Sequence, residues 1–182
     1  AGMSAVFIRL GKCNLACAWC DTDYLKFGMM RLSDILGRLQ TYAARNIIIT
    51  GGEPTIQPHL SVLLDALKAQ GYRLCIETNG LKPAPAQIDY VAASPKACYA
   101  QKYQQQCIEA ADEVRIVADG DVLAFCAEME QKIRAAHYYL SPCEIDGQMN
   151  IYDTIRQIGL LNARADAQVH WQLSVQTHKW AG

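Results

Sequence analysis

The sequence predicts an α/β fold, a partial, open (βα)6-type TIM-like barrel with reduced helices, in a single domain over residues 1–182. Short β-rich runs alternate with amphipathic helical patterns, which is typical of βα units that build a parallel sheet. The first and last β-rich runs alternate polar with apolar residues, whereas strands covered by helices on both faces are apolar throughout. We therefore expect these two strands to line a concavity, as the strands of an open barrel do.

The order of elements follows from these patterns. The predicted strands are Ser4–Leu10, Asn46–Thr50, Arg73–Glu77, Tyr90–Ala93, Glu113–Ala118, His137–Leu140 and His170–Val175. The predicted helices are Leu32–Ala44, Pro58–Gln70, Val122–Ala135 and Ile151–Ala165. We expect Ser33 or Asp34 to cap the start of the first helix and Gly71 to end the second, because hydroxyl and carboxylate side chains favour N-caps and glycine favours helix ends.

Polar and apolar side chains alternate most clearly in the two outer strands. In the first strand, Phe7 and Arg9 share the face opposite to Val6 and Ile8. Arg9 would then point into the interior, where a guanidinium needs an anion. An internal pair with Glu77 or another barrel acid meets that need. The last strand alternates in the same way between two sets, Trp171, Leu173 and Val175 on one face and Gln172, Ser174, Gln176 and His178 on the other.

Composition limits the partners of the protein. The 182 residues are 51% hydrophobic, with a formal net charge of -1 and a pI near 6.5. There is no basic cluster for nucleic acid, so a small-molecule substrate is expected. The sequence has neither an apolar run long enough to cross a membrane nor the pattern of a signal peptide, and we expect a cytoplasmic protein.

The eight cysteines fall into two groups. A chain of this size needs no disulfides, and five single cysteines are expected to be reduced core or surface thiols: Cys75, Cys98, Cys107, Cys126 and Cys143. Cys13, Cys17 and Cys20 instead form a C-x3-C-x2-C triplet. Three clustered thiolates without a fourth partner predict a 4Fe-4S cluster with one open iron, because a structural zinc site takes four ligands. Unliganded thiols, or a zinc site completed elsewhere, are the alternative.

Two motifs together carry a family resemblance. The triplet directly follows the first predicted strand, and Thr50-Gly51-Gly52-Glu53-Pro54 follows the second. This combination resembles the radical S-adenosylmethionine superfamily, in which the open iron binds the amino and carboxylate groups of that cofactor. Four further segments occur in the order seen in the 7-carboxy-7-deazaguanine synthase family, which the chain resembles nearly from end to end: Cys20-Asp21-Thr22, Glu77-Thr78-Asn79-Gly80, Ser94-Pro95-Lys96 and Gln176-Thr177-His178-Lys179.

The resemblance implies an activity and its cofactors. The family converts 6-carboxy-5,6,7,8-tetrahydropterin to 7-carboxy-7-deazaguanine and ammonia, an early step toward queuosine and other 7-deazapurines. A 4Fe-4S cluster, S-adenosylmethionine and Mg2+ are the implied cofactors, and the barrel is implied to be of the radical S-adenosylmethionine kind. An electron donor such as flavodoxin and a homodimer are implied as partners.

The resemblance also implies which residues contact S-adenosylmethionine. They are Trp19, Cys20, Asp21, Gly52, Ser94, Pro95, Lys96, Ser141 and Pro142. The Ser-Pro-Lys segment alone would be a commonplace turn. The Ser141-Pro142 pair stands where related sequences often carry Gln-Pro. No side chain is assigned a catalytic role, because the radical chemistry belongs to the cofactor.

Substrate and magnesium residues are implied at both ends of the chain. The implied substrate contacts are Arg9, through the pterin carboxylate, with Thr50, Gln176 and His178. Thr22 is implied to coordinate Mg2+, which prefers hard oxygen ligands and can share them with a carboxylate. An ordinary turn or capping hydroxyl is the alternative for Thr22, and a structural histidine is an equally good interpretation of His178. The remaining histidines are expected in surface or packing roles: His59, His137 and His170.

Two other functions stay open at this point. A glycyl-radical activase would share both motifs but act on a protein partner, and a non-catalytic zinc-binding module would contain no iron. The family also carries a segment with a Gln-Gly-Glu motif before the first strand, whereas this chain enters that strand through Ala1-Gly2-Met3-Ser4. We therefore expect the N-terminal segment to be missing.

Overall fold

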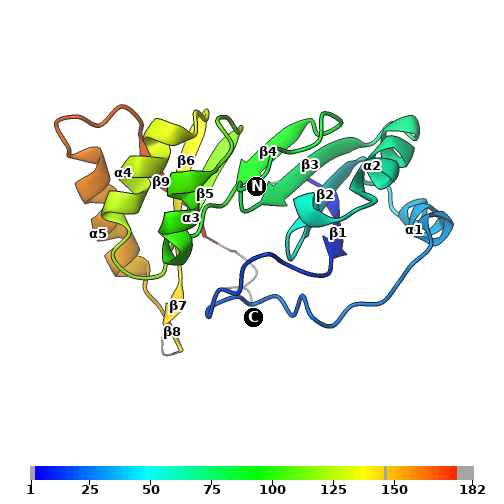
Figure 1. Cartoon of the computed structure of the whole chain (residues 1–182), viewed down its shortest axis with the longest axis horizontal. Coiled ribbons are helices and arrows are strands. Elements are labelled where there is room, and N and C mark those ends of the chain that lie inside the picture. The colour runs from blue at the N-terminus through cyan, green and yellow to red at the C-terminus, as the bar shows by residue number, and fades with distance from the viewer. Residues whose placement is uncertain (1–2, 146, 176–182) are drawn as a thin grey trace. The chain divides into compact units, whose positions relative to one another are not determined.

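The computed structural model describes residues 3–145 and 147–175, and its parallel strands follow the order β1-β2-β3-β4-β5-β6-β9 (Figure 1). The predicted α/β fold with an open parallel sheet is confirmed. The described residues form two compact units. The first contains residues 3–16, Cys20–Thr78 and Pro83–Val91, and the second contains Cys17–Trp19, Asn79–Lys82 and the residues from Ala92 onward. Strand β4 (Tyr90–Ala93) contributes residues to both units.

The first unit is built on three parallel strands and two helices. The strands are β1 (Ala5–Leu10), β2 (Asn46–Gly51) and β3 (Arg73–Thr78), the helices are α1 (Leu32–Leu39) and α2 (Leu60–Ala69), and a 3-10 turn, η1 (Pro54–Ile56), follows β2. Aliphatic side chains from β2, β3 and α2 form its fully buried centre: Ile47, Ile49, Leu64, Leu67, Leu74 and Ile76. Burial of this aliphatic layer is the main force that holds α2 on the strands.

Strand β1 shows the predicted alternation. Val6 and Ile8 are partly buried and pack against the aliphatic core of the first unit. Phe7 is 56% exposed and Arg9 is also exposed. The face that carries Arg9 is therefore open, and the burial cost that we invoked to require an anion beside Arg9 does not apply.

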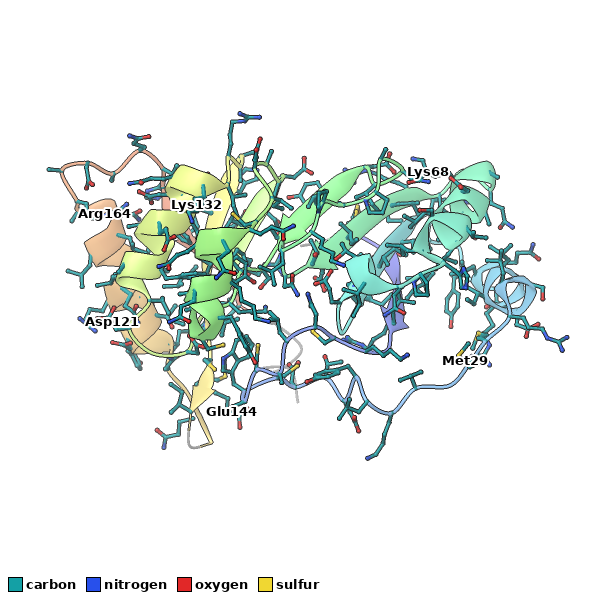
Figure 2. The ribbon with its side chains drawn as sticks, in the orientation of Figure 1. Met29, Lys68, Asp121, Lys132, Glu144 and Arg164 are labelled. Carbon is teal, nitrogen blue, oxygen red and sulfur yellow. The ribbon has the colours of Figure 1, made fainter. Side chains whose placement is uncertain are left out.

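An ion pair ties α2 to β3 in the first unit. Lys68 of α2, labelled in Figure 2, donates to both carboxylate oxygens of Asp89 at 2.7 and 2.8 Å. The backbone N–H of Leu74 in β3 donates to the same carboxylate at 2.7 Å. The Leu74 hydrogen bond, followed by that from Lys68, lowers the pKa of Asp89 below its usual range.

The second unit contains three neighbouring parallel strands, β5 (Glu113–Ala118), β6 (His137–Pro142) and β9 (Trp171–Leu173). Its helices are α3 (Ala100–Gln105), preceded by the 3-10 turn η2 (Ala97–Tyr99), α4 (Leu123–Lys132) and α5 (Ile151–Asn162), and β7 (Glu144–Ile145) with β8 (Gln148–Met149) forms a small hairpin. Helix α5 packs beside β6 and β9 (Figure 1). No helix in residues 3–145 and 147–175 has the length and apolar character that spanning a bilayer demands.

A buried polar contact locks β9 onto α4. Trp171 is completely buried, and its indole N–H donates to Glu130 at 2.9 Å. Glu130 also pairs with Arg164, which Figure 2 labels beyond α5. Because the buried carboxylate has both an N–H donor and a cationic partner, its burial is compensated.

Each of the seven predicted strands and four predicted helices is present in the structure, and the differences lie at their ends. The predicted N-caps Ser33 and Asp34 are wrong: α1 begins at Leu32, with Arg31 as an N-cap that makes no side-chain bond. Ser33 instead donates to the Asp34 carboxylate at 3.3 Å. Gly71 ends α2 as predicted, at a φ of 77° that favours glycine. Helix α3 and the β7–β8 hairpin were not predicted.

Two glycines after β2 allow two backbone segments to touch. A Cβ atom on Gly51 would lie 2.0 Å from the Leu10 carbonyl oxygen, and one on Gly52 would lie 1.9 Å from that of Lys12. Gly51 also has a φ of 133°, in the region that favours glycine. The Gly-Gly pair is therefore required for the contact between the end of β1 and the turn after β2.

We predict that Gly51→Ala lowers the free energy of unfolding by about 3 kcal/mol or more, because the new methyl group meets backbone atoms that cannot rotate away. Gly37→Ala is the matched control, since Gly37 lies within α1 and a Cβ there meets nothing within 4 Å. This control should raise stability by about 0.5–1 kcal/mol. Urea unfolding followed by circular dichroism measures both, and equal effects of the two substitutions would contradict the prediction.

Candidate functional site

The three clustered cysteines lie in the loop after β1. Cys13 is half-buried, and its sulfur accepts the N–H of Leu15 at 3.4 Å. Burial raises the pKa of the Cys13 thiol. Cys17 is half-buried and Cys20 is exposed. All eight cysteines are among the described residues, and none of them forms a disulfide in this structure.

The start of this loop is bonded to the turn after β2, backbone to backbone. The N–H of Gly52 donates to the Leu10 carbonyl at 2.9 Å, and the N–H of Glu53 donates to the Lys12 carbonyl at 2.8 Å. Lys12 has a φ of 63°, which is uncommon for a residue with a side chain. The sharp turn at Lys12 starts the chain into the cysteine loop, and the two hydrogen bonds hold that turn in place.

The buried side chain of Glu53 also holds this turn in place through hydrogen bonds. Its side chain is fully buried, and one carboxylate oxygen accepts hydrogen bonds from the Thr55 N–H at 3.0 Å and from the Thr55 and Thr78 hydroxyls at 2.7 Å each. A buried carboxylate is tolerated only with such partners. We did not assign a role to Glu53 from the sequence, because its partner Thr78 lies 25 residues away.

A row of polar side chains crosses the carboxyl ends of the three strands in the first unit. Arg9 of β1 is in register with Thr50 of β2, and the Thr50 hydroxyl donates to Glu77 of β3 at 2.8 Å. Arg9 donates to the hydroxyl of Thr22 at 3.0 Å, and that hydroxyl lies 3.4 Å from the Asp21 carboxylate. Within residues 3–145 and 147–175, Arg9 forms no ion pair, so the expected alternative of a pair with Glu77 is not formed.

A groove opens beside this row in the first unit. It has a volume of about 870 Å³, and Arg9 and Thr22 line it together with apolar side chains such as Phe7 and Phe27. A guanidinium and a hydroxyl next to an apolar wall suit a flat ring system that carries a carboxylate. The two predicted residues Arg9 and Thr22 are thus brought together, although they are 13 positions apart in the sequence.

The second unit gathers another group of predicted residues. The Lys96 ammonium donates to the Ser94 hydroxyl at 2.7 Å and lies 5.3 Å from the centre of the Trp19 ring. The indole N–H of Trp19 donates to Asp119 at 2.7 Å. Asp119 directly follows β5, and no sequence motif marks its position, so it was not predicted as a site residue.

Ser141 and Pro142 end strand β6, opposite Val117 and Ala118 of β5. The Ser141 hydroxyl oxygen is buried and has no hydrogen-bond partner within the part of the chain that the structure describes. Such an atom is costly unless something outside the chain bonds to it. This observation fits the predicted role of Ser141 in contacting a bound cofactor.

The donor set suits the implied cofactors. Three cysteines within eight positions supply soft thiolate ligands for iron. Across residues 3–145 and 147–175, no three His, Cys, Asp or Glu side chains are arranged to hold a single metal ion. Gln176 and His178, expected at the substrate, lie outside the described residues.

Known proteins resemble this chain over its whole length. Residues 7–98 match the Radical SAM superfamily. The chain is 83% identical over 181 residues to a 7-carboxy-7-deazaguanine synthase from Neisseria meningitidis serogroup B strain MC58, covering 100% of this chain and 85% of that protein. It is 56% identical over 181 residues to the enzyme of the same name from Haemophilus influenzae strain Rd, again with 100% and 85% covered. The crystal structure of QueE from Escherichia coli superposes with a TM-score of 0.66 at 27% identity, over 96% of this chain and 86% of that one.

These similarities and the cysteine loop define an enzyme of the radical S-adenosylmethionine superfamily, which uses a 4Fe-4S cluster and S-adenosylmethionine. The enzyme prediction is thereby confirmed over the alternative of a non-catalytic zinc-binding module. Within that superfamily, the chain belongs to the 7-carboxy-7-deazaguanine synthase family. The resemblance inferred from the motifs is confirmed.

We predict that Glu53→Ala lowers the free energy of unfolding by about 3 kcal/mol, because it removes the buried acceptor of three hydrogen bonds. Thr55→Ala, which removes one of the hydroxyl donors and leaves the carboxylate in place, should cost about 1 kcal/mol. Urea unfolding of the reduced protein compares the two variants. A smaller effect of Glu53→Ala than of Thr55→Ala would show that the carboxylate does not anchor the turn.

Proposed function

We propose that the chain converts 6-carboxy-5,6,7,8-tetrahydropterin to 7-carboxy-7-deazaguanine and ammonia, in the synthesis of queuosine and related 7-deazapurines. The observation that carries this proposal is the 83% identity to a 7-carboxy-7-deazaguanine synthase over the whole chain. The hydrogen bond between Arg9 and Thr22, which both line the groove, is the geometric observation that supports this proposal.

In this proposal, Arg9 and Thr22 hold the substrate carboxylate with Mg2+. The Arg9 guanidinium offers a fork that matches a carboxylate, and the Thr22 hydroxyl offers a hard oxygen to the metal. A guanidinium and Mg2+ are both cations, so a shared site would favour an anion whose attraction to both outweighs their mutual repulsion. The substrate carboxylate supplies that anion, so we expect Mg2+ and the substrate to bind together more tightly than either binds alone.

Cys13, Cys17 and Cys20 hold the 4Fe-4S cluster in this proposal. The cluster and S-adenosylmethionine supply the radical chemistry, a one-electron reduction and hydrogen abstraction from the substrate. The residues that we propose to contact the cofactor are Trp19, Cys20, Asp21, Gly52, Ser94, Pro95, Lys96, Ser141 and Pro142. Ser141 contributes a buried hydroxyl that a cofactor atom can satisfy.

Other parts of the proposal rest on the family and on sequence. Thr50, Gln176 and His178 contact the substrate, and the Thr50 hydroxyl is oriented by its hydrogen bond to Glu77. The chain acts in the cytoplasm as a homodimer of one-domain subunits, and a low-potential donor such as flavodoxin supplies the electron.

We predict that anaerobically reconstituted protein forms 7-carboxy-7-deazaguanine from the pterin, S-adenosylmethionine, Mg2+ and dithionite, and that Cys17→Ala abolishes product. Cys107→Ala is the matched control, because Cys107 is a half-buried single cysteine outside the proposed site, and it should retain full activity. Chromatography with mass detection identifies the product. The proposal fails if loaded wild-type protein makes no product, and product from Cys17→Ala would show that the cysteine triplet does not hold the cluster.

We also predict that Thr22→Ala turns over slowly and loses its response to Mg2+, because the alanine removes the oxygen ligand. Binding of S-adenosylmethionine to the reduced cluster should stay within about twofold of wild type, a difference of about 0.4 kcal/mol. Initial rates across a magnesium series measure the first effect, and the electron paramagnetic resonance spectrum of the reduced cluster measures the second. An unchanged magnesium response would remove Thr22 from the metal site.

A further inference from the structure

The Trp19 indole is held by a carboxylate that is distant in the sequence. Its N–H donates to Asp119 at 2.7 Å across a separation of 100 residues. Both residues belong to the second unit, and both are half-buried. A short hydrogen bond between a neutral N–H and a carboxylate is stronger than one between two neutral groups, so the orientation of the indole ring depends on Asp119.

The backbone places Asp119 rigidly at the end of β5. Ala118 is the last residue of the strand and is in register with Pro142 of β6. The Ala118 carbonyl accepts a hydrogen bond from the Asn150 side chain at 2.7 Å, and the Asp119 N–H donates to the Val117 carbonyl at 3.0 Å. The carboxylate therefore projects from the end of a strand, and a strand end positions a side chain more precisely than a loop does.

The second partner of the Trp19 ring is Lys96, which carries the opposite charge to Asp119. Its ammonium lies 5.3 Å from the ring centre, within the range of a cation–π contact. The same ammonium donates to Ser94 at 2.7 Å. The indole thus contacts an anion at its N–H edge and a cation over its face. The hydrogen bond to the carboxylate polarises the indole, and this strengthens the attraction between the ring face and the ammonium.

Trp19 lies between two of the three proposed cluster ligands, Cys17 and Cys20. We propose that Asp119 is a positioning residue that fixes the Trp19 indole, and through it the segment that binds S-adenosylmethionine beside the cluster. This inference rests on the cofactor site of the proposed function and adds a residue that acts through Trp19. Lys96 lies over the same indole, so loss of Asp119 leaves the ring held only by its contact with the ammonium among the interactions described above.

The test measures cofactor binding to the reduced cluster, without pterin. The protein is loaded with its cluster anaerobically, reduced with dithionite and titrated with S-adenosylmethionine, and the change in its electron paramagnetic resonance spectrum gives the dissociation constant. We expect Asp119→Ala to raise this constant about tenfold, the worth of one hydrogen bond to a charged group. Asp119→Asn keeps an oxygen acceptor without the charge and should raise it about threefold.

Two further variants separate positioning from other roles. Asp121→Asn is the matched control, because Asp121 is an exposed carboxylate two positions along that bonds to the Leu123 N–H (Figure 2); its constant should equal that of wild type. Trp19→Phe keeps a ring but lacks the N–H donor. In the Trp19→Phe background, Asp119→Ala should change the constant less than twofold, because the interaction it removes is already absent.

The outcomes decide the inference. Equal effects of Asp119→Ala in the wild-type and Trp19→Phe backgrounds would overturn it, as would a wild-type constant for Asp119→Ala. Loss of the cluster from a folded Asp119→Asn variant would also overturn it, because Asp119 would then be needed for cluster assembly. If Asp119→Ala does not fold, Asp119→Asn and its combination with Trp19→Phe give the same comparison. Since no pterin is present, a failure of pterin turnover leaves this result unaffected.

Discussion

The rest of the site depends on the backbone contact between the end of β1 and the turn after β2. Gly52 and Glu53 donate to the carbonyls of Leu10 and Lys12 at 2.9 and 2.8 Å, and the approach is so close that a Cβ on Gly52 would overlap the Lys12 carbonyl. The cysteine triplet and the Gly-Gly-Glu-Pro turn are therefore one structural feature. A change in either motif moves the other, because backbone atoms on both sides have no room to adjust.

Sequence patterns predicted the strands well and the helix ends poorly, for different physical reasons. A strand in the centre of a parallel sheet is a short apolar run bounded by turn residues, and both signals are local, as in Asn46–Gly51. A helix end depends on what the last turn packs against. Thr41 donates its hydroxyl to the Arg38 carbonyl at 2.8 Å just after α1, so the apolar pattern that continues to Ala44 does not continue the helix.

The sequence allowed roles to be proposed for residues that are close together along the chain, but not for residues whose partners are distant in the sequence. The cysteine triplet and Thr22 lie in one loop, so spacing and family resemblance were enough to propose roles for them. Glu53 and Asp119 take their roles from partners 25 and 100 residues away, which no local pattern reports. A buried Arg9 would need an anion beside it, but Arg9 is exposed and donates a hydrogen bond to Thr22.

Two kinds of structure lie at the carboxyl ends of the strands: turns held by backbone contacts, and side chains on an open face. In the proposed function the cysteine loop and the Gly-Gly turn hold the cofactors, and backbone contacts that leave little freedom to vary set their geometry. Arg9 and Thr22 instead present side chains on an open face, held together by a single hydrogen bond at 3.0 Å. Substitution of Arg9 or Thr22 changes the groups that can bind a ligand without disturbing the backbone contact between β1 and the turn after β2. In the proposed function Arg9 and Thr22 bind the substrate, so a change of substrate would require substitutions there and not in the backbone contacts of the cysteine loop.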